Sequence, residues 1–403
     1  MAGDSPAGEL SAALAGAPLR PARSSAGAPR RNRFTYRLAQ RDDAGALARL
    51  LRGNPFDGAI RLSFEGEPDP LAAAAVYGPV HQTIVAEDRG RIVAMACRAE
   101  RDCFVNGRVA RVAYLCQLRV DRSVRIRREL LAGGFAFCRA LHDEGDACAC
   151  LVSIVDDNRP AMRLLTSARI PDAPAMRPLE PFVTFAIPVR QGWRAGTTNV
   201  PAGGARIERG RPDLTEPIVE CLQRYGERHQ LAPLWTAEDL VSPSRMPTLR
   251  IEDFLVMREG GRVTACLATW DQRSFRQTVV RGYSPWLARV RFAVNLAARA
   301  GWAPRLPTPG ATLSFAYLSH MAFDDDAERL LGLVDVALAE AGRTGLEFLV
   351  LGAATRHPLA HAVSRRYRHR RYVSRLYLAH WPEDGPLTGT IDGRVPHPEV
   401  AVL

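Results

Sequence analysis

Four arginines crowd the turn between a predicted strand and a predicted helix. The strand covers residues 112–120 and the helix residues 129–142, and the turn between them begins at Asp121. The first N–H groups of a helix and its positive end attract phosphate, and guanidinium groups add charge-assisted hydrogen bonds. The turn therefore predicts a pyrophosphate site formed by Arg122, Arg125, Arg127 and Arg128.

Other residues near this turn could carry acid–base chemistry. Glu87 and Glu100 lie on predicted central strands, where a carboxylate could deprotonate an amine, although an ordinary surface role is commoner for such residues. Tyr114, on strand 112–120, is a candidate proton donor. Asn158 follows a predicted strand at 149–155 and could contact a ligand, cap the next helix, or do both.

Metal and disulfide chemistry have little support in the pattern. The eight cysteines lie mostly in apolar runs and form no CxxC pair, which favours buried free thiols in a reducing compartment. His357 and His361 are four residues apart on a predicted helix, a spacing that suits two metal ligands, but no third ligand stands nearby. We therefore expect no metal and a cytoplasmic protein.

The composition is that of a globular protein with two basic segments. Of the 403 residues 47% are hydrophobic and 24% are charged, and no apolar run is long enough to span a bilayer. The net charge is +11, and every basic side chain is arginine. Segments 272–305 and 356–375 hold seven arginines each and no acid. These two patches, which could contact nucleic acid, carry the imbalance.

The order of predicted elements repeats once along the chain. The turn at Gly90-Arg91 matches Gly261-Arg262, and the stretch from Tyr114 to Val120 matches the stretch from Tyr317 to Phe323. Two halves of this kind predict tandem α/β domains. We expect a disordered arm at 1–33, domains at 34–190 and 206–382, a linker at 191–205, an insertion at 272–310 and a tail at 383–403.

Both halves resemble the GNAT superfamily of acyl-coenzyme A N-acetyltransferases. The strand-turn-helix at 112–142 resembles the family's coenzyme A motif, and Asn158-x-x-Ala161-x-x-Leu164 resembles its later helix. The resemblance implies two domains, each with a mixed, mostly antiparallel sheet flanked by helices. It also implies that a strand segment containing Leu118 and Val120 supplies a backbone donor to the thioester, and that Asn158 lies near pantetheine.

This sequence departs from the family pattern at two places. The turn lacks the family's glycines, which let backbone approach phosphate closely. Leu165 stands where the family often has a tyrosine that protonates the leaving thiolate, while the second half offers Tyr367 on its late helix. After Phe323 the second half has Asp324, Asp325 and Asp326, which would repel a pyrophosphate and are better placed to cap a helix.

The resemblance and the charge asymmetry together predict an enzyme that moves an acyl group other than an aminoacyl group. The expected donor is acetyl-coenzyme A or another acyl-coenzyme A, bound by the first half, and the expected acceptor is a small amine. One alternative is a transferase that uses aminoacyl-tRNA, with the basic segments binding the RNA. The other is a tandem GNAT-like binding or scaffold protein without catalysis. The sequence does not indicate an oligomeric state.

Overall fold

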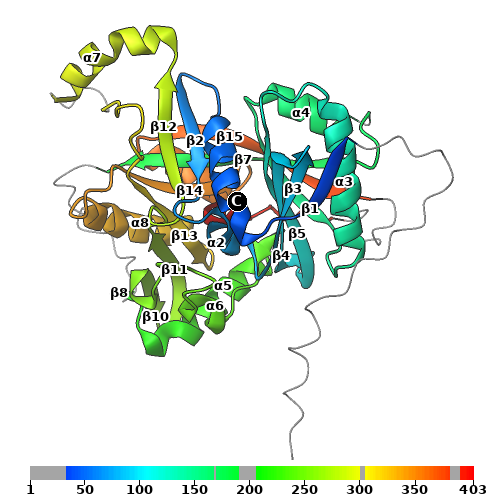
Figure 1. Ribbon diagram of the computed structural model, residues 1–403. Helices are drawn as coiled ribbons and strands as arrows, with labels where there is room; N and C mark the ends of the chain where they lie inside the picture. The colour runs from blue at the N-terminus through cyan, green and yellow to red at the C-terminus, as the bar shows by residue number, and fades with distance from the viewer. Residues whose placement is uncertain (1–32, 168, 190–205, 300–304, 382–390) are drawn as a thin grey trace, which may run out of the picture. The chain divides into compact units, whose positions relative to one another are not determined.

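One large sheet carries strands from both halves of the chain (Figure 1). The computed structural model describes residues 33–167, 169–189, 206–299, 305–381 and 391–403. Residues 34–403 form one compact unit. The predicted arm, the linker and the first part of the tail lie outside the described residues.

The strands of the large sheet follow the predicted order. The first half contributes β1 (Phe34–Leu38), β3 (Val80–Asp88), β4 (Arg91–Val105), β5 (Arg108–Val120), β6 (Cys150–Val155) and β7 (Ala175–Pro188). The second half contributes β8 (Arg206–Arg209), β9 (Ala232–Pro233), β10 (Phe254–Glu259), β11 (Arg262–Trp270), β13 (Phe315–Phe323), β14 (Phe348–Ala354) and β15 (Arg370–His380).

Helices flank this sheet, and two further strands pair apart from it. The helices are α1 (Ala44–Gly53), α2 (Pro70–Ala74), α3 (Arg127–Asp143), α4 (Arg159–Leu165), α5 (Thr215–Gly226), α6 (Ala237–Val241), α7 (Pro285–Arg299), α8 (Ala327–Ala341) and α9 (Pro358–Arg366). Strand β12 (Gln277–Tyr283), from the predicted insertion, pairs with β2 (Ile60–Glu65) of the first half. The sequence did not predict β2, α2 or β12.

The two halves exchange their last strands. The sheet order runs β1-β3-β4-β5-β6-β15-β7-β14-β13-β11-β10-β8. Strand β15 therefore lies between β6 and β7, and β7 lies between β15 and β14. The sheet of each half is thus completed by a strand from the other half. The alternation of apolar residues along a strand does not reveal which strands are its neighbours. Residues 34–190 and 206–382 therefore share one compact unit, and their division into two domains stays a prediction.

A cluster of three histidines fixes the last described segment to the second half. His229 follows α5, His357 caps α9, and the ring of His397 lies 5.4 Å from that of His357. The Nε2 atoms of His229 and His357 are 3.2 Å apart, and Tyr225 Oη lies 2.7 Å from His357 Nε2. Burial lowers the pKa of all three imidazoles, that of His357 to about 3.

This cluster predicts that acid weakens the fold. In the unfolded chain each imidazole takes a proton near pH 6.5, whereas the folded cluster resists it, so below that pH the unfolded state binds more protons. The contribution of the cluster to the free energy of unfolding should be fully present above pH 6.5. As the pH falls below 6.5, the free energy of unfolding should decrease by up to about 1.4 kcal/mol per pH unit for each imidazole. Denaturant unfolding between pH 7.5 and 5 checks this. His357→Gln should make the slope shallower, and an unchanged slope would contradict the assignment.

Candidate functional site

Both halves of the sheet open at the same point of the repeat. In the first half β5 pairs with β6 only over Ala113–Leu115, and in the second half β13 pairs with β14 only over Phe315–Tyr317. Just beyond each pairing the strand bulges, at Gln117 with φ 53° and at His320 with φ 50°. These two residues occupy matching positions of the repeated stretch. On the open side of each bulge, backbone donors have no strand partner and could bind a ligand.

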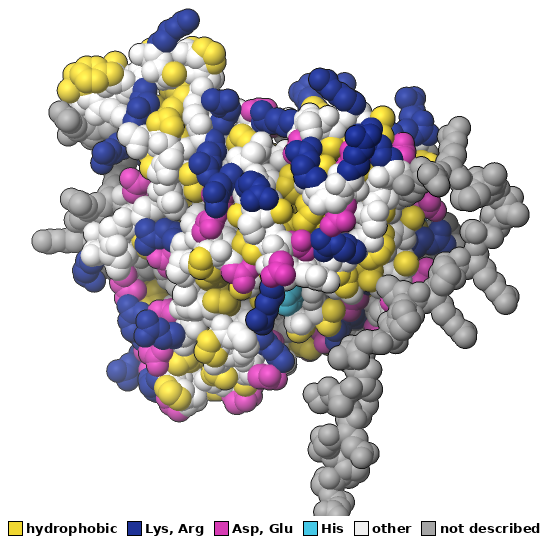
Figure 2. All heavy atoms as spheres, in the orientation of Figure 1, with side chains coloured by type: hydrophobic (Ala, Val, Ile, Leu, Met, Phe, Trp, Pro, Cys, Tyr) yellow, Lys and Arg dark blue, Asp and Glu magenta, His cyan; other side chains and the backbone are white. Residues whose placement is uncertain are grey.

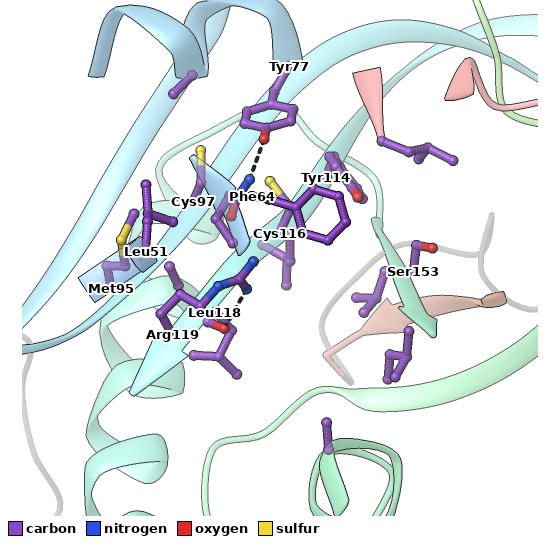
Figure 3. A pocket seen from close by; sticks show the side chains of 18 of the residues that line it. Leu51, Phe64, Tyr77, Met95, Cys97, Tyr114, Cys116, Leu118, Arg119 and Ser153 are labelled. Carbon is purple, nitrogen blue, oxygen red and sulfur yellow. Dashed lines mark hydrogen bonds between the residues drawn. The ribbon is translucent and has the colours of Figure 1, made fainter. Parts of the chain in front are cut away.

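In the first half this opening is a cavity of about 370 Å³. Residues 115–119 of β5 and 152–155 of β6 form two of its walls, and α3, α1 and β2 contribute others. Strands β13 and β15 of the second half close one side with Tyr317 and Tyr372. Figure 3 shows Tyr77, Tyr114, Cys116 and Arg119 around this space. The cavity could hold an acyl thioester beside the bulge.

In the second half the chain itself fills the equivalent opening. The backbone N–H of His320 donates to Glu399 Oε2 at 2.7 Å, and Glu399 Oε1 accepts from the N–H of Ala401 at 3.0 Å. The turn Val400–Val402 packs against β13 and β14 and is buried. A carboxylate oxygen of the chain therefore occupies the position at which the first half leaves its bulge open.

The predicted phosphate turn is exposed and electropositive. Its four arginines are exposed, and none has a carboxylate partner among the described residues. Helix α3 begins at Arg127, so its first N–H groups lie within the turn. Asp121 is turned inward to the loop, accepting hydrogen bonds from the N–H of Ser123 at 2.8 Å and from its hydroxyl at 2.7 Å. The turn is thus able to receive an anion.

The matching turn of the second half is built differently. Asp326 caps α8 by accepting from the N–H of Glu328 at 2.9 Å, as the sequence predicted. Asp324 pairs with Arg262 at 3.2 Å and with Arg224 at 3.5 Å. These carboxylates cap the helix and form ion pairs. The second turn therefore lacks the excess of positive charge that the first turn has.

The structure brings three of the predicted site residues to the cavity. Tyr114, Leu118 and Asn158 line it, and Asn158 also caps α4 by accepting from the N–H of Ala161 at 3.3 Å. Val120 and the four arginines of the turn lie outside its wall, at the end of β5 and beyond. Leu165 lines the cavity without a polar atom to offer.

The two predicted bases are held elsewhere by arginines. Glu87 pairs with Arg37 at 2.5 Å, and buried Glu100 pairs with Arg98 at 2.5 Å. Neither carboxylate lines the cavity. Tyr367, the second half's candidate acid, is buried away from it and donates to Asp335 Oδ1 at 2.9 Å. None of these three side chains can reach a ligand in the cavity while these contacts hold.

The sequence did not identify several residues of the cavity, because tertiary contacts that were not predicted bring them there. Gln117 donates from Nε2 to the hydroxyl of Tyr77 at 2.6 Å. Arg276 stacks over the Tyr77 ring at 4.9 Å and donates to the carbonyl of Ala401 at 2.7 Å. Glu65 of β2 is paired with Arg281 of β12. Of these residues only Gln117 lies in the repeated stretch, and the repeat did not predict its positive φ.

The tyrosines around the cavity are kept protonated. Burial raises the pKa of Tyr77 to about 12 and that of Tyr114 well above its ordinary value of 10. Burial also raises the pKa of the Cys116 thiol well above its ordinary value. At neutral pH these groups can donate protons but do not act as bases or as thiolate nucleophiles.

The two basic segments are less available than their sequences suggest. Carboxylates pair with several of their arginines: Arg273 with Asp271, Arg281 with Glu65, Arg356 with Glu180, Arg366 with Asp335 and Arg375 with Asp156. On the face in Figure 2 many of the arginines lie beside Asp and Glu side chains. Ion pairs within the fold therefore account for five of the fourteen arginines of these segments, while others, such as Arg365 and Arg368, are exposed and have no carboxylate partner among the described residues.

Other site classes find little support in the described structure. All eight cysteines are free thiols, and no three or more His, Cys, Asp or Glu side chains among the described residues are grouped so as to hold a metal ion. No described helix is both long and apolar enough to cross a membrane.

Comparison with solved structures identifies the fold. No family model matches the sequence, and no curated protein does. Saccharomyces cerevisiae N-myristoyltransferase with bound myristoyl-CoA aligns with a TM-score of 0.56 at 13% identity, over 88% of this chain and 85% of that one. A second crystal structure of the same yeast enzyme with myristoyl-CoA gives a TM-score of 0.56 at 13% identity, over 92% and 86% of the two chains. At 13% identity the likeness shows the fold: the chain has the expected α/β fold with GNAT-like halves and shares it with this N-myristoyltransferase over most of both chains.

Proposed function

We propose that the protein is an acyl-coenzyme A-dependent N-acyltransferase whose donor site lies in the first half. The observation that carries this proposal is the difference between two matching openings of one sheet. The first has an open bulge at Gln117, a cavity and an electropositive turn, whereas Glu399 fills the second. The fold is shared with an enzyme crystallised with myristoyl-CoA, which supports an acyl-coenzyme A as the ligand of that cavity.

The open bulge would stabilise the transition state. In the second half the bulge N–H of His320 already binds a carboxylate oxygen, so the matching N–H of Gln117 is placed to bind the oxygen of a thioester carbonyl. Such a fixed donor stabilises the charge that develops when an amine attacks the carbonyl carbon. The arginines of the turn would hold the pyrophosphate, and the walls of the cavity would align thioester and amine.

Tyr114 is the proposed proton donor to the leaving thiolate. It lies on β5 where the pairing with β6 ends, lines the cavity, and keeps its proton because burial raises its pKa. The amine attacks the carbonyl carbon and the carbon–sulfur bond breaks as the amide forms. The leaving sulfur takes the tyrosine proton, the nitrogen loses its extra proton to water, and the tyrosinate regains a proton from water. This assignment supplies the acid that Leu165 does not.

Removing this hydroxyl should slow turnover and leave donor binding intact. Tyr114→Phe is expected to lower kcat about a hundredfold, the contribution of a positioned general acid, with an unchanged Kd for acyl-coenzyme A. Thiol release in steady state and calorimetry measure the two quantities. Tyr372→Phe, which alters another tyrosine of the same cavity, is the control. Equal losses in both variants would argue against a specific acid.

Calorimetry separates the proposal from its two rivals. The enzyme should bind acetyl-coenzyme A or a longer acyl-coenzyme A with a micromolar Kd and release thiol when amines are added. Absence of binding, together with RNA that co-purifies and dissociates with salt, would favour an aminoacyl-tRNA-dependent transferase. If the protein binds neither acyl-coenzyme A nor RNA, the binding or scaffold alternative is favoured.

A further inference from the structure

Arg119 is a largely buried cation without an anionic partner. It lies on β5 two residues after the bulge, lines the cavity, and stacks over the Phe56 ring at 4.9 Å. Its Nη1 donates to the carbonyl of Leu118 at 2.9 Å, and its Nε is buried without a hydrogen-bond partner. Among the described residues no Asp or Glu side chain pairs with it. Figure 3 shows it beside Leu118 and Cys116.

A second arginine of the same cavity differs from Arg119 in having an anionic partner. Arg98, on the neighbouring strand β4, is fully buried, and it pairs with Glu100 at 2.5 Å and with Gln82 at 3.0 Å. The one Asp or Glu side chain in the described cavity wall, that of Glu65, is engaged by Arg281 and Ser63. No Asp or Glu side chain of the wall is therefore left to neutralise Arg119.

An unpaired guanidinium in an apolar cavity is costly. Removing a cation from water costs several kcal/mol unless an anion and further hydrogen bonds compensate it. Burial accordingly lowers the pKa of Arg119, the only anionic contributions coming from Tyr and Cys side chains that are themselves protonated at neutral pH. A group that destabilises the free protein in this way is typical of a site that a ligand completes.

We propose that Arg119 binds a carboxylate of the substrate inside this cavity. The inference rests on the proposed function and adds a substrate class to it. The carboxylate arrives either on the acyl group, as in a dicarboxylic acyl thioester, or on the amine acceptor, as in an amino acid. Planar guanidinium groups match carboxylates, and two parallel hydrogen bonds would use Nε and one terminal nitrogen.

Paired ligands that differ only in the carboxylate test this and identify its source. The donor arm compares succinyl-coenzyme A with butyryl-coenzyme A by calorimetry. The acceptor arm compares glycine, alanine and phenylalanine with methylamine, ethylamine and phenethylamine, each added to the complex with coenzyme A. We expect at least tenfold tighter binding of the carboxylate in one arm, and loss of that preference in Arg119→Met.

Three outcomes overturn the inference. Preference in neither arm would do so, as would a preference that Arg119→Met retains. An equal loss of succinyl- and butyryl-coenzyme A binding in Arg119→Met would instead assign Arg119 to the coenzyme. If the wild type binds no acyl-coenzyme A at all, the proposed function fails and the inference with it, whereas binding without discrimination overturns the inference alone.

The stability of the free protein gives a reading that does not depend on activity. Arg119→Met should raise the Tm of the free protein, because it removes an uncompensated cation from an apolar site. Arg98→Met is the matched variant and should lower the Tm, because it leaves Glu100 buried without its partner. A fall in Tm for both variants would make Arg119 a structural residue and contradict the assignment.

Discussion

Reversing two charges of the exposed turn, Arg125→Glu with Arg128→Glu, is expected to weaken acyl-coenzyme A binding about a thousandfold. Each guanidinium would contribute a charge-assisted hydrogen bond to the pyrophosphate, worth roughly 1.5–3 kcal/mol. Losing two of them removes about 4 kcal/mol, and the new carboxylates add repulsion. Calorimetry with acetyl- and longer acyl-coenzyme A measures the change. Because both side chains are exposed and without carboxylate partners, the fold should be unaffected.

A matched double variant controls for the change in net charge. Arg365 and Arg368 are also exposed, lie in the second basic segment and have no carboxylate partner among the described residues. Arg365→Glu with Arg368→Glu alters net charge by the same amount and should leave acyl-coenzyme A binding within about twofold, because neither residue belongs to the turn and salt screens exposed charges. A similar loss in both double variants would mean that net charge, rather than the turn, attracts the ligand.

The sequence predicted those features that local patterns encode. The helix predicted at 129–142 is present as Arg127–Asp143, and the strand predicted at 149–155 is present as Cys150–Val155. The resemblance of Tyr114–Val120 to Tyr317–Phe323 aligned Gln117 with His320, the two positions at which the structure shows bulges, although the bulges themselves were not predicted. Arginines in one turn and aspartates in the other were likewise visible as composition.

Long-range pairing could not be predicted in this way. Strand β15 alternates as a strand should, but its pattern does not say that β6 and β7 are its neighbours. The pairing of β2 with β12 joins segments more than 200 residues apart and brings Glu65 to Arg281. Glu100 looked available as a base because its sequence neighbours do not show that Arg98 turns toward it. Charge pairing of this kind is decided by tertiary structure.

The filled second opening explains why one chain has two GNAT-like halves and one candidate site. Burial raises the pKa of Glu399, but N–H groups from His320 and Ala401 bind its oxygens and favour the ionised form. Its segment completes the core around β13 and β14. The second half instead lends walls to the first, through Tyr317, Tyr372 and Arg276. The second half therefore contributes part of the wall of the cavity that lies in the first half.

Strand exchange predicts that one core substitution destabilises both halves together. Phe185 of β7 is 1% exposed, lies opposite Arg371 of β15 and Leu351 of β14, and packs in the core of the second half. Phe185→Ala should lower the free energy of unfolding by about 3–5 kcal/mol. Unfolding should remain a single transition, with amides of α3 and α8 losing hydrogen-exchange protection by similar amounts, because each half needs the other's strand. Val109→Ala, at a site 52% exposed, should change stability by less than about 0.5 kcal/mol. Loss of protection confined to α8 would show that the halves fold as separate units despite the shared sheet.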